Sequence, residues 1–344
     1  MRVIGAGEAS WIMPNANAQG YYRFNLPVEM WSSLIDAFGQ LRVGEQLAIV
    51  DSAFAMFEAG DLDADVLKRV IAASAQAEDR RVISAPMTSL TRIVQMLEGD
   101  DRKDVQSHLM SLYEDRLRQA RRQNGVETRL LDGALTGFLA FSAEAPSYRE
   151  ETIDRAKSFL GIGQPARADA LLADEYWDAF TLLIQVGGED EYLALAAEIE
   201  SRDDASFEMA AISALGTTRN LELAAAARQS ILDGSFGARE SFNLMANQMA
   251  EPAIREEAWL WLQENYLAFV ERIPRQWRRR TPSLFESFCD VSRLSELNVL
   301  FELQGSLAPG YEGSLAQTQE RIQLCSAIKA SKVSAFVEAI RAAP

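Results

Sequence analysis

The residues that could carry catalysis are few in this sequence, and histidine is the scarcest of them. His108 is the single histidine among 344 residues. A hydrolytic zinc site needs three protein ligands, typically two from an H-E-x-x-H helix, with water in the fourth position. His108 cannot build that site alone, and no G-x-S-x-G elbow supports a serine nucleophile. We therefore predict no catalytic or metal-binding residue in this chain, and we expect His108 to be a partly buried or surface helical residue.

Two cysteines, Cys289 and Cys325, are the next candidates. Neither has a partner at C-x-x-C spacing, so the sequence predicts no structural zinc site and no redox motif. Both fall in ordinary helical patterns, and thiols of cytoplasmic proteins stay reduced. We therefore expect two reduced core cysteines rather than a disulfide.

Two glycine-containing segments imitate phosphate-binding loops. Residues 1–10 place Gly5 and Gly7 after a strand-like start, as in a dinucleotide-binding turn, where glycines let the backbone approach a pyrophosphate. The third glycine position is Ser10, and Trp11-Ile-Met-Pro14 replaces the expected helix. No nucleotide site is predicted here, and residues 161–165 are interpreted as a loop between helices.

Four arginines form the best candidate for ligand contact. Arg275, Arg278, Arg279 and Arg280 lie within six residues, with Trp277 among them. Guanidinium groups bind carboxylates and phosphates through paired hydrogen bonds. A basic turn on an acidic protein can instead pair with nearby glutamates, as exposed ion pairs do. We call these four residues the arginine cluster and predict, as the ligand hypothesis, that they bind a carboxylate or a phosphate.

The elements that would hold these residues are helices. From residue 28 onward apolar residues recur at i, i+3, i+4 and i+7, the period that lines one face of an α-helix. Each stripe is predicted to be packed core rather than a ligand pocket. The stripes are Trp31, Leu34, Ile35 and Phe38; Leu47, Val50, Phe54 and Phe57; Leu90, Ile93, Val94 and Leu97; Leu109, Leu112, Tyr113 and Leu117; and Trp259, Leu262, Tyr266, Phe269, Val270 and Ile273.

Short glycine-containing breaks separate the stripes and predict where helices turn. Breaks so closely spaced are typical of antiparallel helix pairs that stack into a curved array. The predicted breaks lie at residues 60–61, 99–100, 161–165, 187–188 and 216–218.

The predicted fold is therefore all-α, a curved array of antiparallel helix pairs similar to HEAT or armadillo repeats. The alanine-rich stretches 205–216 and 221–233 resemble one unit of a degenerate repeat. No low-complexity linker divides residues 28–344, so we predict one domain there. Its weakest points are residues 142–148 and 161–165.

Composition limits the partners of such a domain. Fifty acidic against 34 basic residues give a formal charge of −16, which repels phosphate backbones and anionic lipids. No stretch approaches the ~20 apolar residues of a membrane span, and residues 1–10 lack the regions of a signal peptide. We predict no nucleic acid and no membrane as partners, and a cytoplasmic location.

The segment before the helices is different. Residues 21–26 are aromatic-rich, fit a short strand, and end at Pro27. Residues 11–26, WIMPNANAQGYYRFNL, resemble the W-x-x-P-N-A-x-x-x-G-Y-Y-R-F segment of bacterial members of the aminopeptidase N family of zinc metallopeptidases, which includes the alanyl and puromycin-sensitive enzymes. In that family this segment is the last strand of a β-sandwich and leads into a C-terminal helical domain. Ala18-Gln19 departs from the glycine-containing pairs common there.

Further matches occur in the same order along the chain. Residues 41–60 are similar to the family's L-x-x-x-E-[RQ]-L-x(3)-D-x(8)-G helix, with Gln46 where arginine is common. Residues 259–274 resemble its W-x-W-x-x-x-N segment, and residues 315–325 resemble its closing helix. The resemblance implies terminal strands of a truncated β-sandwich at residues 1–27 and the α-helical C-terminal domain at residues 28–344.

The resemblance also implies a function. The family's saddle domain, its H-E-x-x-H zinc domain and its G-A-M-E-N segment precede this region and are absent from the sequence. The helical domain closes as a bowl over the active site and shapes substrate access. The chain is thus expected to hold no cofactor and to be inactive alone. Zinc would belong to the parent aminopeptidase, whose catalytic and β-sandwich domains, together with peptide substrate, would be its partners.

Two other classes of function remain open. A stand-alone helical-repeat scaffold for protein–protein interaction would share the architecture without a peptidase. An orphan strand at residues 21–26 argues against it, because an unpaired edge promotes aggregation. An independent enzyme would need a cleft lined by carboxylates with perturbed pKa values.

Overall fold

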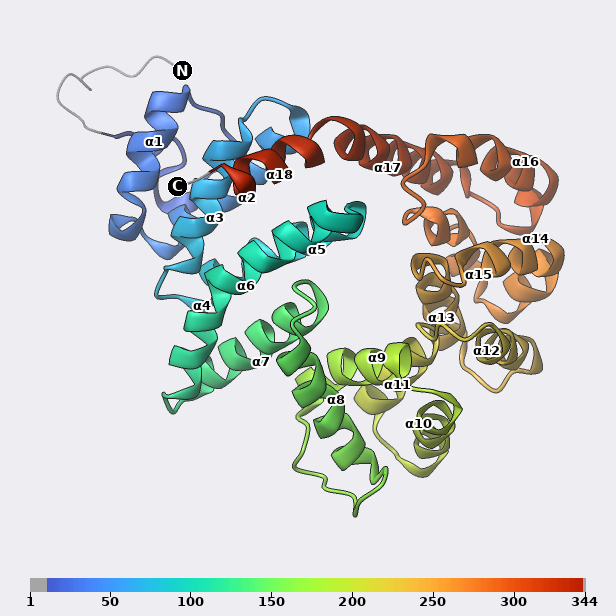
Figure 1. Cartoon of the computed structure of the whole chain (residues 1–344). Helices are drawn as coiled ribbons and strands as arrows, with labels where there is room; N and C mark the ends of the chain where they lie inside the picture. Colours follow the sequence, from blue (N-terminus) through green and yellow to red (C-terminus); the bar gives the residue numbers. More distant parts are fainter. Residues whose placement is uncertain (1–10, 343–344) are drawn as a thin grey trace. The chain divides into compact units, whose positions relative to one another are not determined.

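The computed structural model describes residues 11–342, apart from the side chain of Glu200. Within that part of the chain every regular element is an α-helix or a 3₁₀-helix, and no strand occurs (Figure 1). The predicted all-α class is confirmed. Over the same residues, no helix is long and apolar enough to cross a membrane. The curved array of antiparallel pairs stays a prediction.

The chain folds into two compact units. Unit 1 comprises Met1–Tyr148 and Ile328–Pro344, and unit 2 comprises Arg149–Ala327. The first boundary falls at the end of residues 142–148, one of the two weak points that the sequence indicates. The predicted domain boundary at residue 27 stays a prediction.

Unit 1 is a group of helices closed by the last helix of the chain. Most residues of the predicted stripes lie in its core: Trp31, Leu34, Leu90 and Leu109 are completely buried, whereas Leu47 and Leu112 are only half-buried. α3 packs on α1 and α2, and α6 packs on α7. Its helices are α1 (Val28–Asp36), α2 (Val43–Ala59), α3 (Ala64–Ala75), α4 (Arg80–Ser84), α5 (Met87–Met96), α6 (Gly99–Arg121), α7 (Val126–Phe141) and α18 (Val333–Arg341), with the 3₁₀-helices η1 (Ala16–Ala18) and η2 (Phe38–Gln40).

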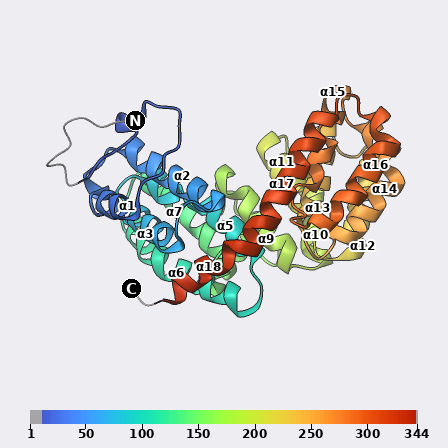
Figure 2. The ribbon, with the colours of Figure 1, turned by 90° about the horizontal axis from the view of Figure 1, so that it is seen from above.

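The closing helix α18 lies against α3 and α6 (Figure 2). Phe336 is buried, and its ring meets the ring of Phe57 edge-on at 6.1 Å. Lys68 donates from Nζ to the carbonyl oxygen of Ala339 at 2.7 Å. A cation at the C-terminus of a helix satisfies free carbonyls and complements the helix dipole. Residues from the two ends of the sequence therefore share one core.

The segment 11–26 lies on unit 1 without forming the predicted strand. Residues 21–27 are extended but carry no ladder, because a strand needs a partner backbone and the described residues provide none. Side chains hold the segment instead. The ring of Phe24 stacks on Trp31 at 5.6 Å, and Arg23 pairs with Asp51 at 2.9 Å. That residues 1–27 end a β-sandwich stays a prediction, and residues 1–10 lie outside the described part.

Unit 2 begins within α8 (Pro146–Leu160) and continues as successive packed helices. α11 packs on α9, α10 and α13, and α14 packs on α12 and α13. The predicted repeat unit at residues 205–233 matches α11 and α12 closely. The elements are η3 (Ala173–Glu175), α9 (Tyr176–Val186), α10 (Glu189–Ser201), α11 (Ala205–Leu215), α12 (Leu221–Asp233), α13 (Ala238–Ala250), α14 (Arg255–Arg272), α15 (Arg275–Arg278), η4 (Thr281–Phe285), η5 (Val291–Arg293), α16 (Leu294–Gln304), η6 (Gly305–Leu307) and α17 (Glu312–Ser331).

An aromatic cluster forms one end of the unit 2 core. Phe207, completely buried, lies with its ring centroid 5.3 Å from Phe180, 5.8 Å from Tyr176 and 6.2 Å from Phe159. The guanidinium of Arg202 covers the Phe207 ring at 4.9 Å. Edge-to-face and offset pairs at these distances add to the stabilisation from apolar burial.

The expectation of reduced cysteines is wrong. Cys289 and Cys325 form a disulfide whose Cα atoms are 5.1 Å apart, across a sequence separation of 36 residues. Sequence spacing did not indicate the bond, because the two residues are far apart in the sequence and meet only when α17 lies beside the turn after η4. Both cysteines are partly exposed rather than core residues.

Candidate functional site

The arginine cluster lies on a short helix and the turn that follows it. α14 ends at Arg272, buried Ile273 follows, and Pro274 precedes the first residue of α15. Proline cannot continue the hydrogen-bond ladder of α14, but its fixed φ suits the start of a new helix. Two short-range bonds then close the turn: Trp277 N–H to the Pro274 oxygen at 2.7 Å, and Arg280 N–H to the Trp277 oxygen at 2.8 Å.

Contacts with residues of the unit 2 core hold this turn in place. The half-buried ring of Trp277 meets the Phe242 ring edge-on at 6.3 Å. Completely buried Thr281 shares a 2.7 Å hydrogen bond with the hydroxyl of Tyr266. Burial raises the pKa of Tyr266 to about 12, so its hydroxyl stays protonated. The backbone that carries the cluster is therefore fixed by unit 2.

The four arginine side chains differ in exposure. Arg275, Arg279 and Arg280 are exposed, whereas Arg278 is half-buried and donates from Nε to the Ile273 oxygen at 3.2 Å. No ion pair joins any of the four to a carboxylate in the described part of the chain. The alternative that they pair with local glutamates is thus not what the structure has, and three guanidinium groups are free for a ligand.

Two other arginines of unit 2, unlike the cluster, have carboxylate partners. Arg293 pairs with Glu256 at 2.5 Å and with Glu296 at 3.0 Å, and Arg321 pairs with Glu286. On a chain of charge −16, most basic groups find an acidic partner. Three exposed arginines within six residues, without an acidic partner among the described residues, concentrate positive charge on one turn, which favours an anionic group.

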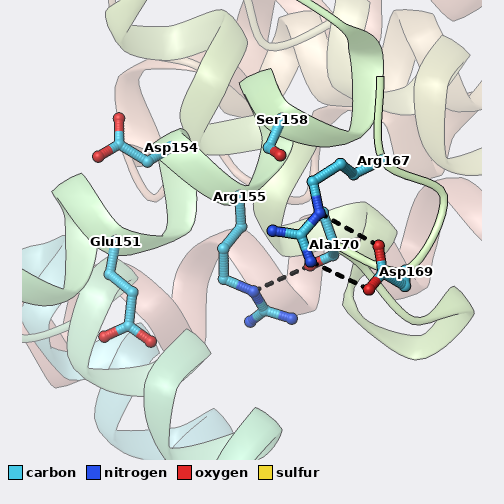
Figure 3. A pocket seen from close by; sticks show the side chains of 7 residues that line it. All are labelled: Glu151, Asp154, Arg155, Ser158, Arg167, Asp169 and Ala170. Atoms are coloured by element: carbon cyan, nitrogen blue, oxygen red, sulfur yellow. Dashed lines mark hydrogen bonds and ion pairs between the residues drawn. The ribbon is translucent and has the colours of Figure 1, made fainter. Parts of the chain in front are cut away.

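A pocket of about 500 Å³ lies on unit 2, between α8 and the loop that follows it (Figure 3). Gly161 opens that loop at φ +72°, where a Cβ would lie 3.2 Å from the backbone nitrogen of Ala166. The Arg167 N–H then bonds to the Ser158 oxygen at 2.9 Å, which folds the loop back on α8. The lining residues are Glu151, Asp154, Arg155, Ser158, Arg167, Asp169 and Ala170.

Both pocket arginines are already occupied. Arg155 donates to the Ala170 oxygen at 3.0 Å and to Oε2 of Glu175 at 2.6 Å. Arg167 holds Asp169 at 3.0 Å, which lowers the pKa of that carboxyl (Figure 3). Burial, with the charge of Glu175, raises the pKa of nearby Asp178 to about 6. Because both arginines are engaged and the lining also holds Glu151 and Asp154, the pocket is a weaker anion site than the arginine cluster. Sequence reasoning placed a loop here, as observed, but gave no sign of the pocket.

His108 is half-buried on α6, as predicted from its place beside Leu109. Burial, with the charge of Lys68, lowers its pKa, so the imidazole is neutral at pH 7. Between residues 11 and 342, no group of three or more His, Cys, Asp or Glu side chains is placed to hold a metal ion.

Comparison with known proteins gives the family. The ERAP1-like C-terminal domain matches residues 11–324. The chain is also 30% identical over 82 residues, 23% of its length, to the mouse (Mus musculus) thyrotropin-releasing hormone-degrading ectoenzyme. That match covers 8% of the ectoenzyme, so the chain spans a small part of this relative.

The family match covers the N-terminal segment, the helices from α1 to α16 and the arginine cluster, and it ends within α17, before α18. It agrees with the resemblance carried by residues 11–26 and by the helices after them. The chain therefore belongs to the ERAP1-like C-terminal domain family, the C-terminal helical domains of the aminopeptidase N family.

Proposed function

We propose that this chain is the C-terminal helical domain of a zinc aminopeptidase that removes N-terminal residues from peptides. The family match over residues 11–324 carries the proposal. In this role the domain encloses the active-site chamber and shapes substrate access. It contributes no catalytic residue of its own.

Zinc and the general base belong, in this proposal, to the catalytic domain of the parent enzyme. A hydrolytic zinc ion needs three protein ligands, and the lone His108 and its surroundings do not supply them. The partners of the chain are then the catalytic and β-sandwich domains and the peptide substrate, with no role for nucleic acid or membrane. Exposed Tyr21 and Tyr22 lie on the segment that would join the β-sandwich.

The first experiment measures metal and activity on the purified chain. We expect no stoichiometric zinc by atomic spectroscopy and no release of chromophore from aminoacyl anilides. Adding the separately expressed catalytic part should yield a complex with chelator-sensitive activity. Turnover by the isolated chain that survives further purification and disappears with a chelator would overturn the assignment.

The arginine cluster is the proposed contact for peptide carboxylates. Its support is local: Arg275, Arg279 and Arg280 are exposed, anchored by a fixed turn and without an acidic partner in the described chain. A guanidinium binds a carboxylate through two parallel hydrogen bonds. The contact would favour peptides whose free C-terminus reaches this turn, and so would influence the preferred peptide length.

A charge reversal tests the cluster in the full-length enzyme. Arg279→Glu combined with Arg280→Glu should weaken the preference for longer peptides and leave cleavage of a short aminoacyl anilide unchanged. The matched control reverses Arg122 and Arg129, which are exposed arginines of unit 1 with no ion pair among the described residues. If the length profile survives the cluster reversal, the cluster is not a peptide contact.

A stand-alone scaffold is the competing proposal, and the DNA upstream of the Met1 codon separates the two. An open frame that continues through an H-E-x-x-H motif supports the aminopeptidase domain. A stop codon followed by a ribosome-binding site would assign the chain to the scaffold class.

The cellular location follows from a different observation. Disulfides form and persist in oxidising compartments and are rare in the cytosol. The Cys289–Cys325 bond therefore favours an oxidising compartment over the cytoplasm that we expected from the sequence. Thiol alkylation during cell lysis, followed by mass spectrometry of both cysteine peptides, decides between them.

A further inference from the structure

Helix α17 is long but shallowly packed. Of its 20 residues only Thr318 and Ile322 are buried, and Leu315 and Cys325 extend the same face as partly exposed residues. α14, with 18 residues, buries six side chains that include Trp259 and Phe269. Because apolar burial is the main source of packing free energy, α17 gains little from its contacts.

The polar contacts of α17 do not compensate. Arg321 pairs with Glu286, Gln319 bonds to Asn298 at 2.5 Å and Lys329 pairs with Glu98 at 3.5 Å, and all three contacts are exposed to solvent. Exposed pairs of this kind stabilise weakly. The buried hydroxyl of Thr318 has no hydrogen-bond partner among the described residues, which is unfavourable.

Covalent and aromatic contacts hold the two ends of this face. Before the helix, the ring of Tyr311 stacks on Phe301 at 5.2 Å. Near its other end, Cys325 is bonded to Cys289. In the last two turns of the helix inside unit 2, Ile322 is the one buried apolar contact among the described residues, and the disulfide is the covalent one.

Cys289, the other cysteine of the disulfide, lies on a turn that packs against the core. Phe285 and Phe288, just before Cys289, place their rings 4.9 Å and 6.1 Å from the Trp259 ring. Ser287 donates from Oγ to the Met249 oxygen at 2.9 Å. These contacts involve neither α17 nor the disulfide. Breaking the bond should therefore leave the turn in place and free the helix.

The disulfide is also accessible to a reductant. Both cysteines are partly exposed, and exposed disulfides are the more readily reduced ones. Cys325 precedes by three residues the point at which the chain returns to unit 1 at Ile328. The disulfide thus lies just before the second of the two points at which the chain passes from one unit to the other.

We propose that the Cys289–Cys325 disulfide holds the C-terminal half of α17 in place and is sensitive to reduction. When a dithiol reductant breaks the bond, this half of the helix is released while the rest of unit 2 stays folded. One thiolate of the reductant attacks the sulfur of one cysteine, breaks the Cys289–Cys325 bond and expels the other cysteine as a thiolate, so that a mixed disulfide forms. The second thiol of the reductant, as its thiolate, then attacks the reductant sulfur of the mixed disulfide and expels the remaining cysteine as a thiolate. Two electrons and two protons pass to Cys289 and Cys325, which become thiols, and the reductant becomes a disulfide.

Hydrogen exchange on the full chain, with dithiothreitol as the reductant, tests the proposal. After reduction, confirmed by two titratable thiols, the amides of residues 319–331 should exchange at least ten-fold faster. The amides of α14 should change less than two-fold. The Cys289→Ser, Cys325→Ser double variant should reproduce the released state, and dithiothreitol should then have no further effect.

Three results would overturn the proposal. The first is an unchanged exchange rate in residues 319–331 after both thiols have appeared. The second is loss of amide protection from hydrogen exchange throughout unit 2, which would mean that the disulfide stabilises the whole unit. The third is a disulfide that dithiothreitol reduces only in denaturant. The test is independent of any aminopeptidase role, because it reads the isolated chain.

Discussion

The substitution Phe336→Ala tests whether the two ends of the chain share one cooperative core. Phe336 lies on α18, is 1% exposed and meets Phe57 of α2 edge-on. Val333 and Val337 are buried beside it. Arg341 pairs with Asp101 and Asp104 at 2.7 Å and 2.6 Å on the rim of the same interface.

The expected effect follows from the burial of this ring. Replacing a fully buried Phe with Ala costs about 3–5 kcal/mol, because apolar contacts are lost and a cavity remains. For a unit of this size each kcal/mol lowers Tm by ~2–4 °C. The melting of unit 1 should thus fall by roughly 6–20 °C. The exposed rim pairs should retain α18 loosely but cannot replace the core contact.

The assay must distinguish the units, so we would combine thermal unfolding with hydrogen exchange. Amides of α3 and α6 should lose protection, whereas those of α9 and α11 in unit 2 should not. The control is Val126→Ala, at a position 63% exposed in the same unit, which should change stability by less than about 0.5 kcal/mol. An unchanged Tm, or equal loss of protection in both units, would refute a core shared by α18 and the N-terminal helices.

Further substitutions test polar groups that are wholly or partly buried. Burial and the charge of Glu175 raise the pKa of Asp178 to about 6. Between about pH 4 and 6 the folded chain therefore binds more protons than the unfolded chain. The free energy of unfolding falls as the pH rises through that window. Asp178→Asn should therefore gain ~1–3 kcal/mol over the wild type at pH 7.5 but little at pH 4, measured by urea unfolding; an equal gain at both pH values would reject the shifted carboxyl. Thr318→Val removes the unpaired hydroxyl on α17 and should stabilise the oxidised chain by about 1 kcal/mol, whereas Thr217→Val loses a 2.7 Å hydrogen bond to the Ala214 oxygen and should destabilise it. Equal Tm shifts for the two threonine variants would contradict this reasoning.

The sequence predicted the helices well because their signals are local. The stripe from Trp259 to Ile273 is buried throughout, and α14 occupies its span. Gly60 ends α2 in the left-handed conformation at φ +88°, as its place after the Leu47–Phe57 stripe indicates. The helical spacing of apolar residues and the residues that end a helix are set within a few positions of the sequence. Both can therefore be recognised without knowledge of the tertiary structure.

Features that depend on distant residues escaped the sequence. The disulfide joins residues 36 apart, and the bond from Lys68 to Ala339 spans 271 residues. Neither has a local signature. The arginine cluster was found from its composition, but only the structure shows that its guanidinium groups lack acidic partners among the described residues. The strand predicted over residues 21–26 failed because a strand, unlike a helix, needs hydrogen-bond partners from elsewhere.

The division of the chain has a consequence for its biosynthesis. Unit 2 lies wholly inside the sequence of unit 1, and α18 is translated after all of unit 2. Domains tend to fold as they leave the ribosome, so unit 2 can complete its core while the surface of α3 and α6 that receives α18 is still bare. That surface includes Lys68 of α3, and Phe57 of α2 lies at its border, where it meets Phe336. During this interval the nascent chain exposes an apolar site that a chaperone can cover, and a ribosome stalled before codon 333 would leave the site permanently open.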